Sequence, residues 1–139
     1  MSAKFMIKML FGVIAGVAGA VLVISLVQLF SNYLYPIPPG FDKTDPIVLA
    51  AFVSQLPITA LLLVLASYVL GSLFGGFVAT KVSKQYPLPA VVVSGFLTVG
   101  AVLTLVTIPH PAWFSVLTAI CFLPMALVGA RLAGGQIEK

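Results

Sequence analysis

The stretch "SYVLGSLFGGFVATK", residues 67–81, decides the fold. Within it, the small residues Ser67, Gly71, Gly75 and Ala79 occur at every fourth position, which places them on one face of an α-helix. In a bilayer there is little hydrophobic drive between helices, so close backbone approach through small residues supplies the packing. The spacing therefore predicts a membrane-spanning helix that packs closely against another helix over about three turns.

The composition around this stretch is that of a membrane protein. Of the 139 residues, 61% are hydrophobic and 7% are charged, whereas soluble domains have about 25% charged residues. Four apolar stretches, residues 9–31, 58–80, 88–108 and 112–133, are each long enough to cross a hydrocarbon core of about 30 Å. We predict an all-α membrane protein, a single domain over residues 1–139, with four transmembrane helices in an antiparallel up-and-down bundle. The first apolar run is too long for a signal-peptide core, so we expect an uncleaved span.

The basic residues are distributed unevenly between the two sides of the predicted spans. Of the seven Lys and Arg residues, only Lys43 lies in the loops on one side, close to Asp42 and Asp45. An excess of Lys and Arg marks cytoplasmic segments, so we expect both termini to face the cytoplasm. The basic residues on that side are Lys4, Lys8, Lys81, Lys84, Arg131 and Lys139.

Proline pairs punctuate the connections, in "YPIP", "YPLP" and "IPHP". Proline ends one helix and suits the first turn of the next. Asp45 followed by Pro46 is a typical helix start, with Asp as the N-cap. We expect a short interfacial helix over residues 46–55 on the outer surface, a break near Pro57, and a kink at Pro124 in the fourth span.

Two further sets of small residues accompany the first one. Gly12, Gly16 and Gly19 lie in the first span, and Ala126 and Ala130 lie in the fourth. All of these sets begin near basic residues, so we expect tight packing in the cytoplasmic half and wider spacing in the outer half. The spacing does not decide whether these faces join helices of one chain or of two. The outer half is either filled by its large side chains or left open as a funnel; those side chains are Phe30, Leu61, Leu105 and Phe122.

Reactive groups are scarce. The centres of the spans contain no ionisable residue, which disfavours a proton-coupled pump. The turn "TIPHPAWF", residues 107–114, holds the only histidine, His110, and with Trp113, Asp42 and Asp45 it forms a candidate ligand or outer-face site. Zinc needs three or four ligands, so we expect no metal or cofactor and interpret His110 as a turn residue. Arg131 is a candidate contact for a lipid headgroup. The basic residues do not form the stripe that is typical of a nucleic-acid-binding protein, so we expect no nucleic-acid partner.

Four segments resemble a group of small four-span bacterial inner-membrane proteins without a known activity. These segments are "YPIPPGFDKTDP", "GSLFGGFVATK", "IPHPAWF" and "LPMALVGARLA", within residues 35–133. The resemblance implies a bacterial inner membrane and four spans. It implies no activity and no site residues.

Three functional hypotheses follow. The leading one is a non-catalytic multi-pass membrane module that self-associates, or packs against a partner membrane protein, through its small-residue helix faces, with bound lipid as a further possibility. The alternative is a carrier or channel for a small neutral or apolar solute or lipid, which needs a cavity lined by Gln28, Thr104 or Thr107. The third is an outer-face enzyme that uses His110 and the two aspartates.

Overall fold

The computed structural model describes the whole chain except residues 1, 37–39, 41, 43, 108–109 and 135–139. The described residues form five helices and no strand. Four of these helices are long and apolar enough to cross a membrane, and they pack as a bundle, which confirms the predicted fold class. The five helices are α1 (Ala3–Leu34), α2 (Pro46–Gln55), α3 (Ile58–Ser83), α4 (Leu88–Thr107) and α5 (Ala112–Leu132).

The observed helix bounds differ most from the prediction in α1. The predicted span covered residues 9–31, but the helix begins six residues earlier and ends three residues later. The side chain of Ser2 caps its start by accepting a hydrogen bond from the N–H of Phe5 at 3.1 Å. An apolar run marks only the part of a helix that suits lipid, and these 32 residues are about 48 Å long. The first turns of α1, which carry Lys4 and Lys8, therefore extend beyond a hydrocarbon core of about 30 Å.

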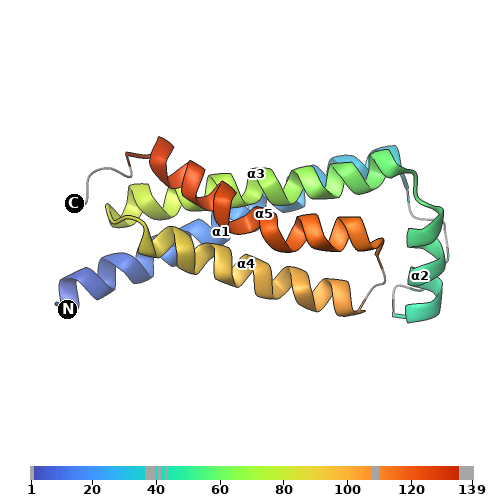
Figure 1. The fold of residues 1–139 in the computed structure, drawn as a ribbon, viewed down its shortest axis with the longest axis horizontal. Coiled ribbons are helices and arrows are strands. Elements are labelled where there is room, and N and C mark those ends of the chain that lie inside the picture. Colours follow the sequence, from blue (N-terminus) through green and yellow to red (C-terminus); the bar gives the residue numbers. More distant parts are fainter. Residues whose placement is uncertain (1, 37–39, 41, 43, 108–109, 135–139) are drawn as a thin grey trace.

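The capping signals place the other helices as expected. The Asp45 carboxylate accepts a hydrogen bond from the N–H of Ile47 at 2.9 Å, and α2 has the predicted bounds. Pro57 is the N-cap of α3, so the expected break lies there. Pro124 lies inside α5, and Figure 1 shows that the axis of α5 changes direction along its length.

The four long helices run back and forth (Figure 1). α3 packs against α1, α4 and α5, and α4 packs against both α1 and α5. α2 runs across one end of the bundle, which we call the α2 end. At the opposite end α1 begins and α5 ends; we call it the basic end, because the described Lys and Arg residues all lie there, namely Lys4, Lys8, Lys81, Lys84 and Arg131.

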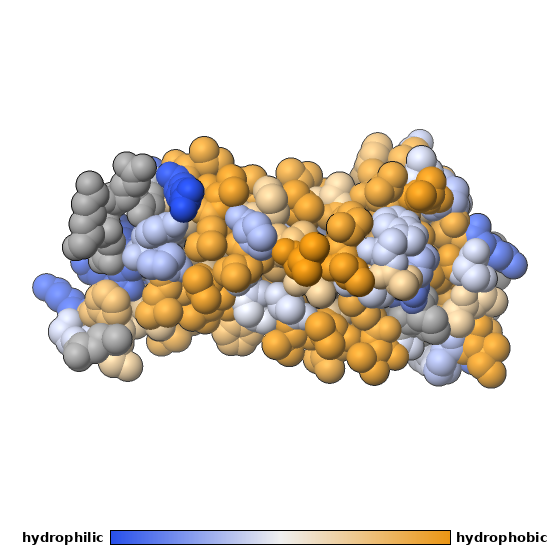
Figure 2. Space-filling view, viewed as in Figure 1, coloured by the Kyte–Doolittle hydropathy of each residue, from blue (hydrophilic) through white to orange (hydrophobic). Residues whose placement is uncertain are grey.

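The surface separates into three zones along the long axis (Figure 2). Hydrophobic side chains cover most of the middle, and hydrophilic residues gather at the two ends. Many large apolar side chains in the middle are more than half exposed, among them Leu22, Leu26 and Leu103. A lipid environment removes the free-energy cost that such exposure has in water.

The large side chains expected between the helices in the outer half differ in burial. Phe122 and Leu61 are buried between the helices, and Leu105 is half-buried. The expectation for Phe30 was wrong, because its side chain is 56% exposed. At this level of α1, the residue that faces the bundle is Ser31.

Candidate functional site

The predicted small-residue faces of α1 and α3 meet each other. A Cβ added to Gly16 would lie 2.6 Å from the carbonyl oxygen of Gly75, and one added to Gly75 would lie 3.0 Å from the carbonyl oxygen of Gly16. Gly12 fits equally closely, because its added Cβ would lie 2.7 Å from the carbonyl oxygen of Ala79. The two backbones therefore touch, as small residues allow. Gly19 and Gly71 belong to the same interface, facing Phe74 and Ile24 respectively.

A second interface joins α3 to α5. Gly76 fits against the backbone of Ala126, and Gly129 fits against the backbone of Leu73, so that an added Cβ at either glycine would overlap a carbonyl group. Ala126 and Ala130 are fully buried, as expected of a packing face. Gly76 and Gly129 were not among the predicted packing residues. The signal that could have identified Gly76 is the four-residue spacing of Ser72, Gly76 and Thr80. Each of these residues lies one position after a member of the predicted face, namely Gly71, Gly75 and Ala79.

These contacts show whether the predicted small-residue faces join helices of one chain or of two chains. The faces built on Gly12, Gly16, Gly71, Gly75 and Ala79 are buried between helices of the same chain. Ser67 is buried as well, and its hydroxyl donates to the carbonyl of Val64. The predicted helix-packing residues therefore hold the monomer together.

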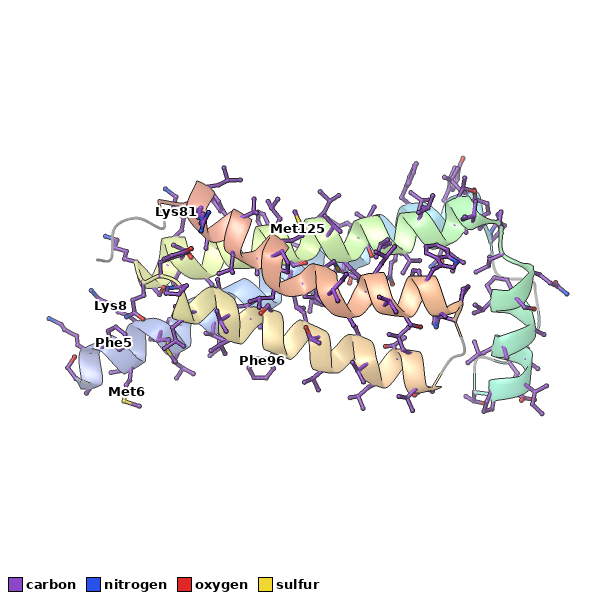
Figure 3. The ribbon with its side chains drawn as sticks, in the orientation of Figure 1. Phe5, Met6, Lys8, Lys81, Phe96 and Met125 are labelled. Atoms are coloured by element: carbon purple, nitrogen blue, oxygen red, sulfur yellow. The ribbon has the colours of Figure 1, made fainter. Side chains whose placement is uncertain are left out.

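A groove opens between α1 and α4 in the half of the bundle nearer the α2 end. We call it the lateral groove; its volume is about 380 Å³, within the range of about 300–1,000 Å³ typical of small-molecule sites. Gln28 and Thr104, two of the three polar residues expected around a cavity, line it. Phe96, 61% exposed, projects from α4 at its edge (Figure 3). The remaining lining residues are Val17, Val21, Ile24, Tyr68, Leu97, Gly100, Ala101 and Phe122.

Two of the three polar groups of the lateral groove that could bond a ligand lie toward the α2 end. Gln28 and Thr104 come from the last turns of α1 and α4, and Tyr68 lies deeper, in the middle of α3. The Thr104 hydroxyl donates to the carbonyl of Gly100 at 3.1 Å and keeps its lone pairs available. The Tyr68 ring packs against Phe122 with the centroids 5.5 Å apart. The groove thus changes from polar near its end to apolar along its depth.

The two aspartates of the outer-face candidate have local roles. Asp42 accepts hydrogen bonds from the backbone N–H of Thr44 at 2.9 Å and from its hydroxyl at 2.6 Å. These bonds, the side-chain one first, hold the pKa of Asp42 below its ordinary value. Asp45 caps α2. Both carboxylates thus stabilise the segment that leads into α2.

His110 and Trp113 pack on α5. The His110 ring stacks on Phe114 with the centroids 4.9 Å apart and the planes 13° apart, and the Trp113 ring meets Phe114 edge-on at 5.9 Å. His110 also lines a cavity of about 250 Å³ with Ala50 and Val53 of α2. Among the described residues, no group of three or more His, Cys, Asp or Glu is placed to hold a metal ion.

Arg131 lies exposed at the basic end, where its Nε donates to the Tyr86 hydroxyl at 3.1 Å. Its predicted contact with lipid headgroups stays a prediction.

No model of a known protein family matches the chain, and neither curated proteins nor solved structures include a match.

Proposed function

We propose that this chain is a non-catalytic multi-pass protein of a bacterial inner membrane, with both termini on the cytoplasmic side, and that it binds an uncharged lipid or another small apolar molecule in the lateral groove. The observation that carries the proposal is the groove itself, which opens sideways between two membrane-spanning helices and has contributions from α1, α3, α4 and α5. The gathering of basic residues at one end supports the orientation.

The lining of the groove specifies the chemical class of its ligand. The walls are mostly aliphatic and aromatic, and none of the described residues that line them is charged. An ionised headgroup would lose hydration there without gaining a counter-charge. A hydroxyl or carbonyl headgroup can instead exchange hydrogen bonds with Gln28, Tyr68 and Thr104 while its chain follows the apolar wall. Diacylglycerols and long-chain alcohols have this character.

Two glycines on α4 provide a matched pair of variants. An added Cβ at Gly100 or at Gly95 meets nothing within 4 Å, so either position accommodates a larger side chain without a clash inside the chain. Gly100 lines the lateral groove and Gly95 does not. Gly100→Leu therefore fills the groove, and Gly95→Leu changes an open surface of the same helix.

The experiment uses a photoactivatable diacylglycerol, incorporated into vesicles that contain the full-length protein. After illumination, mass spectrometry locates the labelled peptides. We expect labelling on α1 and α4 around Val21 and Ala101, its loss in Gly100→Leu, and its retention in Gly95→Leu. Equal labelling of the wild type and Gly100→Leu, or labelling spread evenly over all exposed apolar positions, would contradict the proposal.

A second candidate is self-association through the outward face of α4. The other described glycines within helices lie against a neighbouring helix of the same chain, whereas Gly95 and Gly100 face open space. A second copy packed on the face of α4 that carries Gly95, outside the lateral groove, would use this glycine as a close-approach position. Native mass spectrometry of the wild type and Gly95→Leu distinguishes the candidates, because self-association predicts an oligomer that Gly95→Leu breaks and ligand binding predicts no such change.

A further inference from the structure

A pocket of about 280 Å³ lies at the basic end, between the first turns of α1 and the connection from α3 to α4. We call it the basic pocket; its lining residues are Ser2, Lys4, Phe5, Lys8, Ser83, Lys84 and Gln85. Three of these residues are cations. Figure 3 shows Phe5 and Lys8 on the first turns of α1 and Lys81 at the same end of the bundle.

The three lysines of the basic pocket lack an acidic neighbour among the described residues. The described carboxylate side chains are Asp42 and Asp45, and both precede α2 at the opposite end of the bundle. Three ammonium groups around one cavity raise the local positive potential, and an anion lowers their mutual repulsion. The first N–H groups of α1 point toward the same end and favour negative charge.

Gln85 gives the basic pocket a second, independent feature. Its side chain is only 5% exposed, and its Nε2 donates to the carbonyl oxygen of Phe5 at 3.1 Å. Its Oε1 is buried and accepts no hydrogen bond from any described residue. An amide oxygen buried in this way loses its bonds to water without replacement. A ligand that carries a hydrogen-bond donor restores one of them.

The local backbone fixes this arrangement. Lys84 ends α3 in the left-handed region, with φ of 58°, and its N–H donates to the carbonyl of Thr80 at 2.7 Å. This position after a helix usually holds glycine. Ser83 is buried, and its hydroxyl accepts from the N–H of Gln85 at 3.2 Å. The turn thus presents a cation and an amide side by side to the first turns of α1.

We infer that the basic pocket binds a phosphate ester whose phosphate lies among Lys4, Lys8 and Lys84 and whose hydroxyl or ammonium group donates to Gln85. The first turns of α1 extend past the hydrocarbon core, so the pocket lies at the level of lipid headgroups. A phospholipid headgroup and a free phosphate share this chemistry. The site is separate from the lateral groove, because the two share no lining residue.

The experiment uses the full-length protein in nanodiscs of phosphatidylcholine with a small share of phosphatidylglycerol. Native mass spectrometry after release counts each bound lipid. We expect enrichment of phosphatidylglycerol on the wild type, and a loss of about fivefold for Lys8→Gln and for Lys84→Gln, from the attraction of one cation for an anionic surface. Lys81→Gln is the matched control, because Lys81 lies at the same end over the Phe77 ring, 5.9 Å from its centroid, and does not line the pocket.

Inorganic phosphate, titrated into the detergent-solubilised protein, distinguishes the two sources. Phosphate binding that depends on Lys8 and Lys84, without a preference for phosphatidylglycerol, assigns the pocket to a soluble phosphate ester. Gln85→Met keeps the charge and removes the acceptor, and we expect it to lower binding as well. If Gln85→Met does not fold, the Lys8→Gln and Lys84→Gln variants test the proposal. The proposal is overturned if Lys81→Gln loses as much binding as Lys8→Gln, if a folded Gln85→Met binds like the wild type, or if neither lipid nor phosphate binding depends on Lys8 and Lys84.

Discussion

Adding a single methyl group at Gly16 measures how closely α1 and α3 approach each other. In Gly16→Ala the new Cβ would lie 2.6 Å from the carbonyl oxygen of Gly75 and 2.9 Å from the Cβ of Ala79, whereas ordinary contact begins at 3.4 Å. Both neighbours belong to the framework of α3 and cannot rotate away. Overpacking of this kind costs about 1–3 kcal/mol.

Gly95→Ala is the control for this substitution, because its added Cβ meets nothing within 4 Å. Replacing glycine by alanine in a helix also contributes up to about 1 kcal/mol of helix propensity. Both variants gain this contribution, so it cancels when they are compared. We therefore expect Gly16→Ala to be less stable than Gly95→Ala by about 1–3 kcal/mol.

The free energy of unfolding is measurable in mixed micelles, by reversible unfolding with a denaturing detergent followed by circular dichroism. Variants with the same helix content before unfolding are compared. If the two variants differ by less than about 0.5 kcal/mol, the usual range for substitutions away from packed sites, α1 and α3 do not meet through backbone contact at Gly16.

Three further predictions concern other parts of the chain. Gly75→Leu should prevent compact folding of the monomer, seen as protease sensitivity in the membrane, because this position faces the Gly16 backbone; a protease-resistant variant would count against the observed interface. Asp45→Ala should destabilise α2 by about 1 kcal/mol through loss of its N-cap, and faster amide hydrogen exchange confined to α2 would show it, whereas unchanged exchange would refute the capping role. The pKa of Asp42 lies below its ordinary value, so its bonds to Thr44 stabilise the folded loop above about pH 4 and this contribution is lost as the pH falls through the folded pKa. An NMR titration should show the Asp42 pKa rising in Thr44→Val, and an unchanged value would remove Thr44 as the cause.

Much of the fold was predictable because its signals are local. The bounds of α2 follow from Asp45 and Pro46, which act within one turn. The four spans follow from apolar length alone. The start of α1 was less predictable. Lys4 and Lys8 are compatible with a helix as well as with a loop, and only the Ser2 cap marks where the helix begins.

The functional features were less predictable because they depend on how helices cross. The spacing of Gly71 and Gly75 predicts a close contact but does not name the partner helix, which is set by the whole bundle. The lateral groove exists because α1 and α4 leave space between Gln28 and Thr104, and no local pattern encodes that separation. The Gln85 Nε2 bonds to the carbonyl of Phe5, 80 positions away in the sequence, while its Oε1 has no partner among the described residues, and no local pattern shows either fact.

The two close-packed faces of α3, one against α1 and one against α5, have a consequence for synthesis of the chain. α1 and α3 leave the ribosome before α4 and α5, and their backbones meet directly at Gly16 and Gly75, where Val93 of α4 packs later. The opposite face of α3, around Gly76, is covered only when α5 has been made. Assembly can therefore begin during translation on one side of α3, while the other side stays in contact with lipid or the insertion machinery until α5 has been made. Cysteine cross-linking in stalled nascent chains would show this order directly, with α1–α3 pairs forming before α5 emerges and α3–α5 pairs only afterwards.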